Sequence, residues 1–584
     1  MIHFKFSEYD NRYLFLKCDS KYDHLQIQKL KEHMNLIDPI CYLPTYTGPR
    51  YTQDFLYSYV QPSGDTIYYC AIGLFQVIYK FFDENGIDYD GLKENSHLFK
   101  LPIKHTFEEF KNIVDSWGLK YNPRPYQYKC AYKILQWKSS VSKLATRAGK
   151  TLLAYIVFRY AIEYMGMKRI LMIVPSIDLV KQGYNDFNEY GEFFKTECVW
   201  GGGKLVESAN MTIGTFKSLI KFLDKKSKKY NPDFFNGYDC VFVDETHRAT
   251  ANQIKTIISQ PFMKDVKIAF GMTGTIPKEK TIDFYCLHSL LGAKIQEINP
   301  KELMDGGYIS NILIHQVHLN YPGDDQMKDL FIRCAEYAIG DYVTQKNPKT
   351  LKNEKIKVKD PKFLIQYEKS LPGGIQGIKY QLQQNSETFK NEYIKILNSV
   401  ITNSTGTNSL VVEKMMTHFC EQRIDYLTNE ILPKCNGNTL ILSHHVEYIK
   451  YVYEILKEKF PNRHIAIITG SVATKDRDNV KKLFSEYDDC ILIASYACVG
   501  TGLTIPKLRY GVLFESFKSN VINMQSLGRG LGLVENKDKY EVYDIIDCFD
   551  KSYSKRKLYL QGKEKIKIYQ KEKYDYDIIK INIK

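Results

Sequence analysis

Two series of short apolar runs, separated by helical stretches, constrain the fold of this chain more than any other feature. RILMIVP, YDCVFVDE and KIAFGMT form the first series, between about residues 120 and 312. NTLILSH, HIAIITG, DCILIAS, YGVLFES and EVYDIID form the second. Apolar strands alternating with helices are typical of parallel sheets that are covered on both faces. The sequence therefore predicts an α/β fold with two parallel-sheet domains, since 584 residues are too many for one compact core.

The chain outside these two series differs in character. Residues 1–118 mix alternating stretches (IHFKF, YLFLKC) with helical patterns and predict a small α+β domain that binds nucleic acid. We place the first α/β domain at 119–312 and the second at 313–550. A lysine-rich and partly helical insertion, about 326–430, lies within the second. Residues 551–584, with eleven Lys/Arg against four Asp/Glu, are predicted to be a basic C-terminal tail.

The amino-acid composition indicates which partners the chain could bind and in which cellular compartment it could lie. The net charge of +14 favours a polyanionic partner, because bound phosphates release condensed counterions, although a solvated lysine surface explains the charge equally well. The 13 cysteines show no CxxC pair or zinc spacing, so we expect reduced thiols. The N-terminal MIHFKFSEYDNRY lacks the apolar core of a signal peptide, and no run of about 18 apolar residues occurs. We expect no membrane association and a cytoplasmic location, in the host cell if the chain is phage-encoded.

The segment ATRAGKT at 145–151 has the pattern of a phosphate-binding loop. A glycine turn that leads into a helix directs backbone N–H groups and the positive end of the helix dipole at an anion. Lys150 can then reach the β- and γ-phosphates of ATP, and the Thr151 hydroxyl can ligate Mg²⁺. The full pattern wants a glycine where Leu144 stands, so a simple helix-capping turn is the alternative. The predicted phosphate-binding positions are Thr146, Arg147, Ala148, Gly149, Lys150 and Thr151.

The run CVFVDETHR delivers two carboxylates to the end of an apolar strand. Ligands bind at the carboxyl edge of a parallel sheet, where Asp244 and Glu245 are expected. Asp244 is suited to hold Mg²⁺ through water, and Glu245 to orient and deprotonate an attacking water. Two carboxylates that close a hydrophobic run are costly unless a cation or a donor meets them, which argues against an idle surface pair.

The order AGKT, DETH, MTGT (272–275) and QSLGRG (525–530) resembles that of superfamily-2 helicases over about 120 to 550. The resemblance implies two tandem RecA-like domains that enclose ATP and Mg²⁺ between them and move along nucleic acid. It implies catalytic roles for Gln525 and Arg529, and a role for Thr273 and Thr275 in coupling hydrolysis to movement. Tyr126, Gln127 and Gly502 are the further implied nucleotide-binding positions. The implied nucleic-acid contacts are Pro175, Ser176, Gln182, Gly214, Thr215, Ser443, Ser495 and Thr501.

Within that superfamily the chain resembles the recombination helicases of phages. ELMDGGYIS at 302–310, ASYACVGTGL, KSNVINMQSLGRGLG and YEVYDIIDCFDKSYSK carry the likeness, together with the small N-terminal domain. The resemblance implies action on branched or forked DNA, by branch migration, fork regression, unwinding or annealing, with single-stranded DNA and recombination or replication proteins as further partners.

One position departs from the family pattern. The last motif usually closes on an arginine, and Gly532 stands there, while Arg529 is kept as the predicted arginine finger. Losing such a finger costs about 10³–10⁵ in turnover in related phosphoryl-transfer enzymes. Either a nearby cation substitutes, or the chain is a nucleic-acid binding or annealing protein with weak ATPase. An RNA helicase is the third alternative.

Overall fold

The computed structural model divides into two compact units, Met1–Leu303 and Met304–Lys584. The structure describes residues 1–6, 12–37, 52–91, 99–200, 208–246, 252–341, 343–346, 353–356, 390–391, 394–395, 397–398, 409–469, 474–499, 505, 507–516, 526–534, 537 and 539–583.

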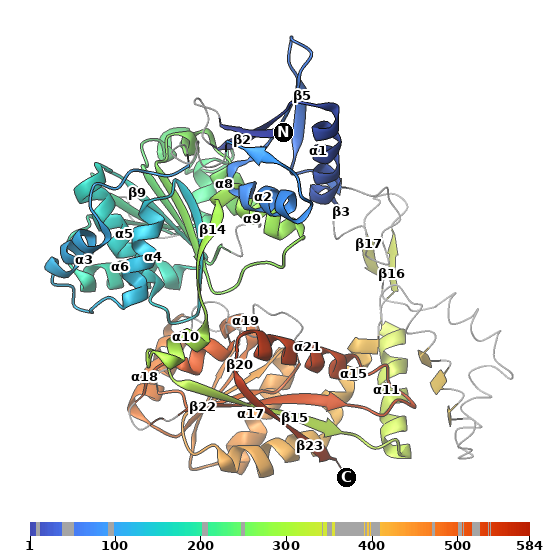
Figure 1. Cartoon of the computed structure of the whole chain (residues 1–584). Coiled ribbons are helices and arrows are strands. Elements are labelled where there is room, and N and C mark those ends of the chain that lie inside the picture. The colour runs from blue at the N-terminus through green and yellow to red at the C-terminus, as the bar shows by residue number, and fades with distance from the viewer. Residues whose placement is uncertain are drawn as a thin grey trace. The chain divides into compact units, whose positions relative to one another are not determined.

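The predicted small α+β domain is present at the start of the first unit, as a mixed sheet with two helices (Figure 1). In sheet order its strands are β5 (Tyr57–Val60), β6 (Thr66–Ala71), β2 (Tyr13–Cys18), β1 (Ile2–Phe6) and β7 (Tyr89–Asp90). A short pair is formed by β3 (Leu36–Ile37) and β4 (Thr52–Gln53). The helical segments are α1 (Lys21–Met34), η2 (Ile72–Leu74) and α2 (Phe75–Glu84). α1 begins at Ser20 because a capping box with Asp23 satisfies its first N–H groups.

This N-terminal domain packs directly on helix α9 of the domain that follows. A Cβ on Gly73 would lie 2.0 Å from the carbonyl oxygen of His288 and 2.6 Å from the Cα of Gly292, so only glycine permits this approach. The Phe55 ring stacks on Tyr285 of α9 at 5.1 Å. The two domains therefore share one hydrophobic core within the first unit.

The first α/β domain is built on a parallel sheet, as predicted, with seven strands among the described residues. In sheet order these are β10 (Thr196–Val199), β11 (Met211–Thr215), β9 (Ile170–Val174), β12 (Cys240–Asp244), β13 (Ile268–Thr273), β8 (Ser139–Leu144) and β14 (Ala293–Ile298). Its α-helices are α3 (Phe107–Ser116), α4 (Pro125–Leu135), α5 (Lys150–Met165), α6 (Ile177–Tyr190), α7 (Phe216–Leu219), α8 (Asn252–Ile258) and α9 (Ile282–Leu291), and α10 (Pro300–Asp305) follows β14. Short 3₁₀ turns are η4 (Ile220–Phe222), η5 (Pro232–Phe235) and η7 (Pro261–Lys264). Every residue of β9 and β11 is buried, which requires cover on both faces of the sheet.

The second α/β domain repeats this design, again with seven parallel strands in the described part of the chain. In sheet order these are β19 (His464–Ile468), β20 (Cys490–Ser495), β18 (Thr439–Ser443), β21 (Tyr510–Leu513), β22 (Lys539–Cys548), β15 (Asn311–Asn320) and β23 (Asp575–Asn582). Its helical segments are α11 (Asp325–Asp341), α15 (Ser409–Phe419), α16 (Glu421–Tyr426), the π-helix η8 (Leu427–Ile431), η9 (Leu432–Lys434), α17 (Val446–Lys459), α18 (Thr474–Glu486), α19 (Tyr496–Val499), η10 (Arg529–Leu531) and α21 (Lys557–Lys571). The five predicted strands of this domain are β18 to β22.

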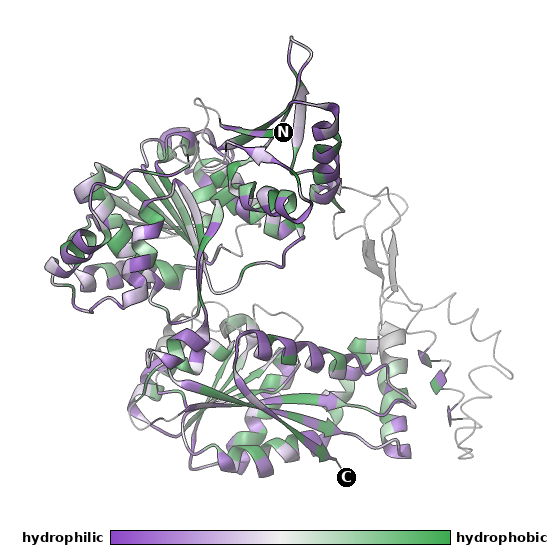
Figure 2. Cartoon of the chain, in the orientation of Figure 1, coloured by the Kyte–Doolittle hydropathy of each residue, from purple (hydrophilic) through white to green (hydrophobic). Residues whose placement is uncertain are grey.

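The residues predicted to be a basic tail differ from that expectation, because they fold into the second domain as α21 and β23. β23 pairs with β15 along eight residues, and Figure 1 shows these strands side by side with the C-terminus at the end of β23. α21 docks through a buried ion pair between Lys565 and Asp544 of β22, and Tyr569 donates to the same carboxylate at 2.8 Å. Composition could not reveal this, since the residues of α21, like those of α1, are mostly hydrophilic (Figure 2).

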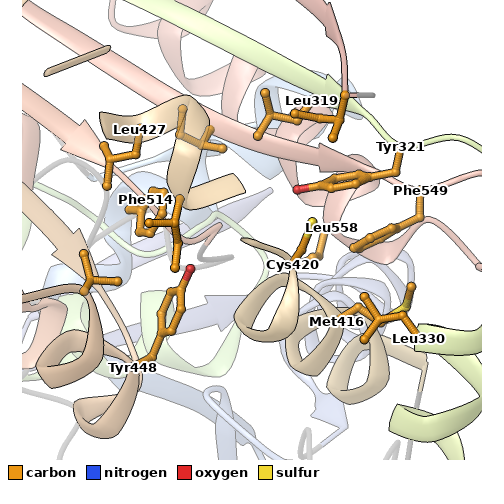
Figure 3. Packing of buried hydrophobic residues seen from close by; sticks show 14 of the residues in the cluster. Leu319, Tyr321, Leu330, Met416, Cys420, Leu427, Tyr448, Phe514, Phe549 and Leu558 are labelled. Carbon is orange, nitrogen blue, oxygen red and sulfur yellow. The ribbon is translucent and has the colours of Figure 1, made fainter. Parts of the chain in front are cut away.

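The core of the second unit mixes aliphatic and aromatic side chains, and among its described residues it encloses the side chain of Arg423. Figure 3 shows Tyr321 beside Phe549 and Met416 beside Leu330, and the first pair of rings stacks at 4.5 Å. Arg423 is fully buried, donates to Asp547 at 2.8 Å and lies 4.0 Å above the Phe514 ring. A buried charge of this kind is tolerated only with such partners.

The predicted helical part of the insertion is confirmed by α15, α16 and η8. Within its lysine-rich stretch a short hairpin joins β16 (Val343–Lys346) and β17 (Asn353–Ile356). The rest of that stretch, and most of NSVITNSTGTNS, lies outside the described residues. In the described part of the chain, no helix combines the length and the apolar character that crossing a bilayer needs.

Candidate functional site

The predicted phosphate loop joins the carboxyl end of β8 to the first turn of α5. Arg147 and Gly149 both adopt left-handed backbone conformations, with φ of 67° and 73°, and α5 begins at Lys150. Left-handed residues alternating with right-handed ones make a concave row of backbone N–H groups, which is suited to an anion. Gly149 cannot be replaced freely, because a Cβ there would lie 2.4 Å from Nε2 of Gln127.

Tyr126 and Gln127, the implied adenine-binding pair, are tied to this loop. Nε2 of Gln127 donates to the carbonyl oxygens of Ala148 at 3.2 Å and Gly149 at 3.1 Å, and its Oε1 accepts from the backbone N–H of Arg124 at 2.7 Å. The Tyr126 hydroxyl donates to the Ala148 carbonyl at 2.7 Å. Gln127 is only 2% exposed. In this structure the pair supports the loop, and its reading of a base stays a prediction.

The two carboxylates of DETH lie at the carboxyl end of β12, as the strand pattern predicted, with Asp244 as its last residue and Glu245 directly after it. Glu245 has a φ of 52°, and its Oε1 accepts a hydrogen bond from Nζ of Lys150 at 3.0 Å. The Lys150 side chain is 16% exposed and the Glu245 side chain 22%. The Glu245 N–H donates to Oδ1 of Asp244 at 2.9 Å. Residues 95 positions apart are thus brought together at one edge of the sheet. An incoming phosphate can replace the carboxylate as the partner of this half-buried lysine ammonium.

The implied coupling motif lies against the same loop. The Thr273 hydroxyl, at the end of β13, donates to the Thr275 carbonyl at 2.9 Å and accepts from the Thr275 N–H at 3.2 Å. This tight turn brings Gly274 beside Thr146, since a Cβ on Gly274 would lie 3.8 Å from the Thr146 hydroxyl oxygen. A movement of this turn would therefore displace atoms of the phosphate loop.

The predicted Mg²⁺ ligands are both oxygen donors, which suits a hard cation: the Thr151 hydroxyl and the half-buried carboxylate of Asp244. The carboxylate of Asp186 on α6 is near this hydroxyl. Burial raises the pKa of Asp186 to about 6, against the opposing effect of Gln182 and Thr151. Gln182, an implied nucleic-acid contact, donates to this carboxylate at 3.4 Å.

The other implied nucleic-acid residues of the first unit gather at the carboxyl edge of β9 and β11, which are neighbours in register with Val174 beside Thr215. Pro175 and Ser176 follow β9 directly, and the Ser176 hydroxyl caps α6 by accepting from Leu179. Thr215 caps α7 in the same way. A Cβ on Gly214 would lie only 2.9 Å from the Leu219 side chain, so glycine allows these two residues to pack this closely. The edge is thus built from capped helix N-termini, which are suited to phosphate oxygens.

In the second unit, Ser443 and Ser495 end the adjacent strands β18 and β20 in register. The Ser443 hydroxyl donates to Glu515 at 2.5 Å, and the Ser495 hydroxyl donates to the Cys498 sulfur at 3.1 Å. Thr501, Gly502 and Gln525 lie outside the described residues.

Glu515 is a residue that the sequence interpretation missed. Its side chain is 3% exposed and accepts from Nε2 of His418 at 2.6 Å, from the Ser443 hydroxyl and from the His444 N–H. Although burial alone would raise the pKa of Glu515, these donors, led by His418, hold it well below its usual range. The signal was available, because YGVLFES closes an apolar run on a carboxylate as CVFVDE does.

The second unit also contains Arg529, the predicted arginine finger, and Gly532, the position that departs from the family pattern. Arg529 begins η10 and is half-buried, and Gly530 packs flat against the Tyr540 ring, where a Cβ would lie 2.2 Å from ring carbons. The Gly532 carbonyl accepts from the Ser310 hydroxyl at 2.9 Å and from Nζ of Lys537 at 3.2 Å. An ammonium group therefore lies next to the position where the family pattern has an arginine.

Comparisons with known proteins agree with this arrangement. The family model of the type III restriction enzyme res subunit matches residues 120–278, and the helicase conserved C-terminal domain matches 422–531. The ATP-dependent DNA helicase UvsW of Enterobacteria phage T4 is 22% identical over 499 residues, which cover 82% of each chain.

Solved structures that this chain matches include the crystal structure of T4 UvsW, at 18% identity and a TM-score of 0.40 over the full length of both chains. The Hef helicase domain of Pyrococcus furiosus matches at 16% identity and a TM-score of 0.42, covering 75% of this chain and 96% of that one.

Proposed function

We propose that this chain is a superfamily-2 helicase, similar to UvsW, that uses ATP hydrolysis to remodel branched or forked DNA in recombination, repair and replication. Branch migration, fork regression, unwinding and annealing are the activities we assign to it, in the cytoplasm of the host cell. The observation that carries the proposal is the meeting of Lys150 with Glu245 at 3.0 Å, beside a left-handed glycine loop, in a chain similar to UvsW.

The ion pair between Lys150 and Glu245 suggests how the ATP site works. Without nucleotide, the lysine neutralises the carboxylate. When ATP enters, its phosphates compete for the Lys150 ammonium, and the exchange releases Glu245 to orient and deprotonate the attacking water. The loop N–H groups around Gly149 bind the phosphate oxygens. Mg²⁺, held by Thr151 and Asp244, neutralises charge on those oxygens when it is bound.

The second unit contributes the residues that the resemblance implies for catalysis. Arg529 approaches the γ-phosphate in our proposal and neutralises charge that develops in the transition state, with Gln525 beside it. Lys537 is our choice for the cation that substitutes for the missing arginine, because its ammonium lies at the Gly532 carbonyl.

The grip on nucleic acid is proposed to be on the backbone rather than on the bases, since a motor must pass every sequence. Ser176 and Thr215 present capped helix N-termini at one edge of the first sheet, and Ser443 and Ser495 end strands of the second. These edges are the surfaces that we assign to the phosphates of the strand.

ATP turnover measured without nucleic acid, then with single-stranded DNA, a four-way DNA junction and RNA, tests the proposal. Stimulation by the junction above that by single strands supports it. Preference for RNA would assign the motor to RNA instead, and DNA binding without any turnover would make the chain a binding or annealing protein.

Lys150→Ala should abolish turnover, because the β- and γ-phosphates lose their cation, and should leave DNA binding largely intact. Lys195→Ala is the matched control, since Lys195 is an exposed lysine on β10's side of the sheet, away from the loop. Turnover that persists in Lys150→Ala would show that the phosphate loop has been assigned wrongly.

A further inference from the structure

A pocket of about 320 Å³ lies inside the first unit, where the N-terminal domain meets the first α/β domain. Both domains line it, through residues such as Arg12, Phe75, Lys138 and Ser289. Pockets for small molecules span ~300–1,000 Å³. This one is therefore large enough for a single nucleotide-sized ligand.

One wall of the pocket is a group of three nearly parallel rings. Phe75 lies 5.3 Å from Phe99 and 5.9 Å from Trp137, and Phe99 lies 5.3 Å from Trp137, with interplanar angles of 23°, 15° and 29°. The rings come from three separate segments of the chain. Flat aromatic surfaces of this kind stack nucleobases, at ~1–3 kcal/mol per base in proteins that bind single strands.

The polar groups of the pocket favour an anion. Arg12, Lys138 and Lys255 line it, and no aspartate or glutamate is found among its described lining residues. Burial lowers the pKa of Lys138, because the ammonium has lost part of its hydration, and a bound anion would reverse that effect.

Ser289 adds a donor. Its hydroxyl oxygen is buried and, within the described part of the chain, makes no hydrogen bond, although Ser289 lines the pocket. Buried hydroxyl groups in proteins are normally hydrogen-bonded, since an unmade bond is costly. A phosphate oxygen in the pocket would accept from it.

The pocket is separate from the phosphate loop. Lys138 directly precedes β8, whereas the loop follows the other end of the same six-residue strand. At ~3.3 Å per residue the two sites are roughly 20 Å apart along the sheet. One molecule of ATP cannot occupy both.

We propose that this pocket is a second nucleotide site, in which a nucleobase packs against the ring group of Phe75, Phe99 and Trp137 and its phosphate is bound by Lys138, Lys255 and Ser289. Two sources offer this chemistry: a free nucleotide, and an unpaired nucleotide at the end of a strand. Binding of a strand end rests on the proposed function, whereas binding of a free nucleotide does not.

The test uses Trp137 fluorescence in the full chain. Trp117→Phe and Trp200→Phe leave Trp137 as the only tryptophan, and Lys150→Ala removes binding at the phosphate loop. AMP, a 5′-phosphorylated hexathymidylate and inorganic phosphate are the three probes. We expect saturable changes with AMP, the oligonucleotide or both, and at least tenfold weaker binding of phosphate alone.

Lys138→Met should weaken binding at least tenfold. Lys255→Met, at an exposed position of the rim, provides the same test if Lys138→Met folds poorly, and Lys195→Met should bind like the parent. Binding of AMP identifies the free nucleotide as a source, and binding of the oligonucleotide alone identifies the strand. The proposal is overturned if neither probe changes the Trp137 signal, if phosphate binds as tightly as AMP, or if both pocket variants bind unchanged.

Failure here is distinguishable from failure of the proposed function. ATP turnover of the wild-type chain reports on the phosphate loop, whereas Trp137 reports on the pocket in a Lys150→Ala background. Unchanged binding in both pocket variants, with normal wild-type turnover, would reject this inference alone.

Discussion

Replacing Gly149 by alanine should disrupt the phosphate loop more than its backbone angle alone explains. Gly149 has a φ of 73°, and a Cβ there would lie 2.4 Å from Nε2 of Gln127, which donates two hydrogen bonds to the loop. Gly166, at the other end of α5, has a φ of 67° and nothing within 4 Å of the same position. Gly166→Ala is therefore a matched control that carries the same backbone penalty without the clash.

The size of the difference follows from these contacts. A left-handed alanine costs roughly 1–2 kcal/mol in either variant. Displacing Gln127 adds the loss of its two bonds to the loop, at about 0.5–1.5 kcal/mol each, so Gly149→Ala should be less stable than Gly166→Ala by about 1–3 kcal/mol. For a domain of this size each kcal/mol shifts Tm by about 2–4 °C, which gives a difference of roughly 2–12 °C.

Differential scanning calorimetry of the two variants measures this difference, and ATP turnover measures its functional effect. We expect Gly149→Ala to melt lower and to lose turnover, while Gly166→Ala keeps most of its turnover. Equal melting temperatures together with equal turnover would refute the idea that Gln127 holds the loop through a contact that only glycine allows.

Three further predictions address the site. Glu245→Gln should lower the maximal rate of ATP hydrolysis by about 10²–10⁴, because a neutral amide cannot accept the proton of water, with ATP binding retained; an unchanged rate would exclude Glu245 as the base. Arg529→Ala should lower turnover by about 10³–10⁵ and Lys537→Met by less, and equal turnover in Arg529→Ala and wild type would remove it as the finger. Asp186→Asn should stabilise the chain at pH 7.5 by about 1 kcal/mol after allowance for solvent screening. Since the folded pKa of Asp186 is raised to about 6, its folded form binds the proton more tightly and wild-type stability falls as pH rises from about 4 to 6. The gain measured by thermal melting should therefore shrink towards pH 4.5, and a gain independent of pH would contradict the assignment.

Much of the site could be predicted from local patterns. The run CVFVDE had to be a buried strand ending in carboxylates, and AGKT had to begin a helix after a glycine turn. Parallel strands share one carboxyl edge, so the convergence of Lys150 and Glu245 followed from pattern and fold class together. What local patterns could not reveal was the use of Gln127, whose amide is occupied by the loop's own carbonyls.

The amino-acid sequence by itself determined which segments become buried strands, where the phosphate loop and its carboxylates fall, and in what order they occur, because periodicity, glycine turns and strand-end charges act over a few neighbouring residues. Only the tertiary structure decided that α21 and β23 complete the second sheet, that Glu515 gathers its donors, and that Gly73 lets the N-terminal domain close on α9 around a pocket. Each of these depends on which distant residues meet, and contacts between segments far apart in the chain leave no repeating pattern in either segment alone.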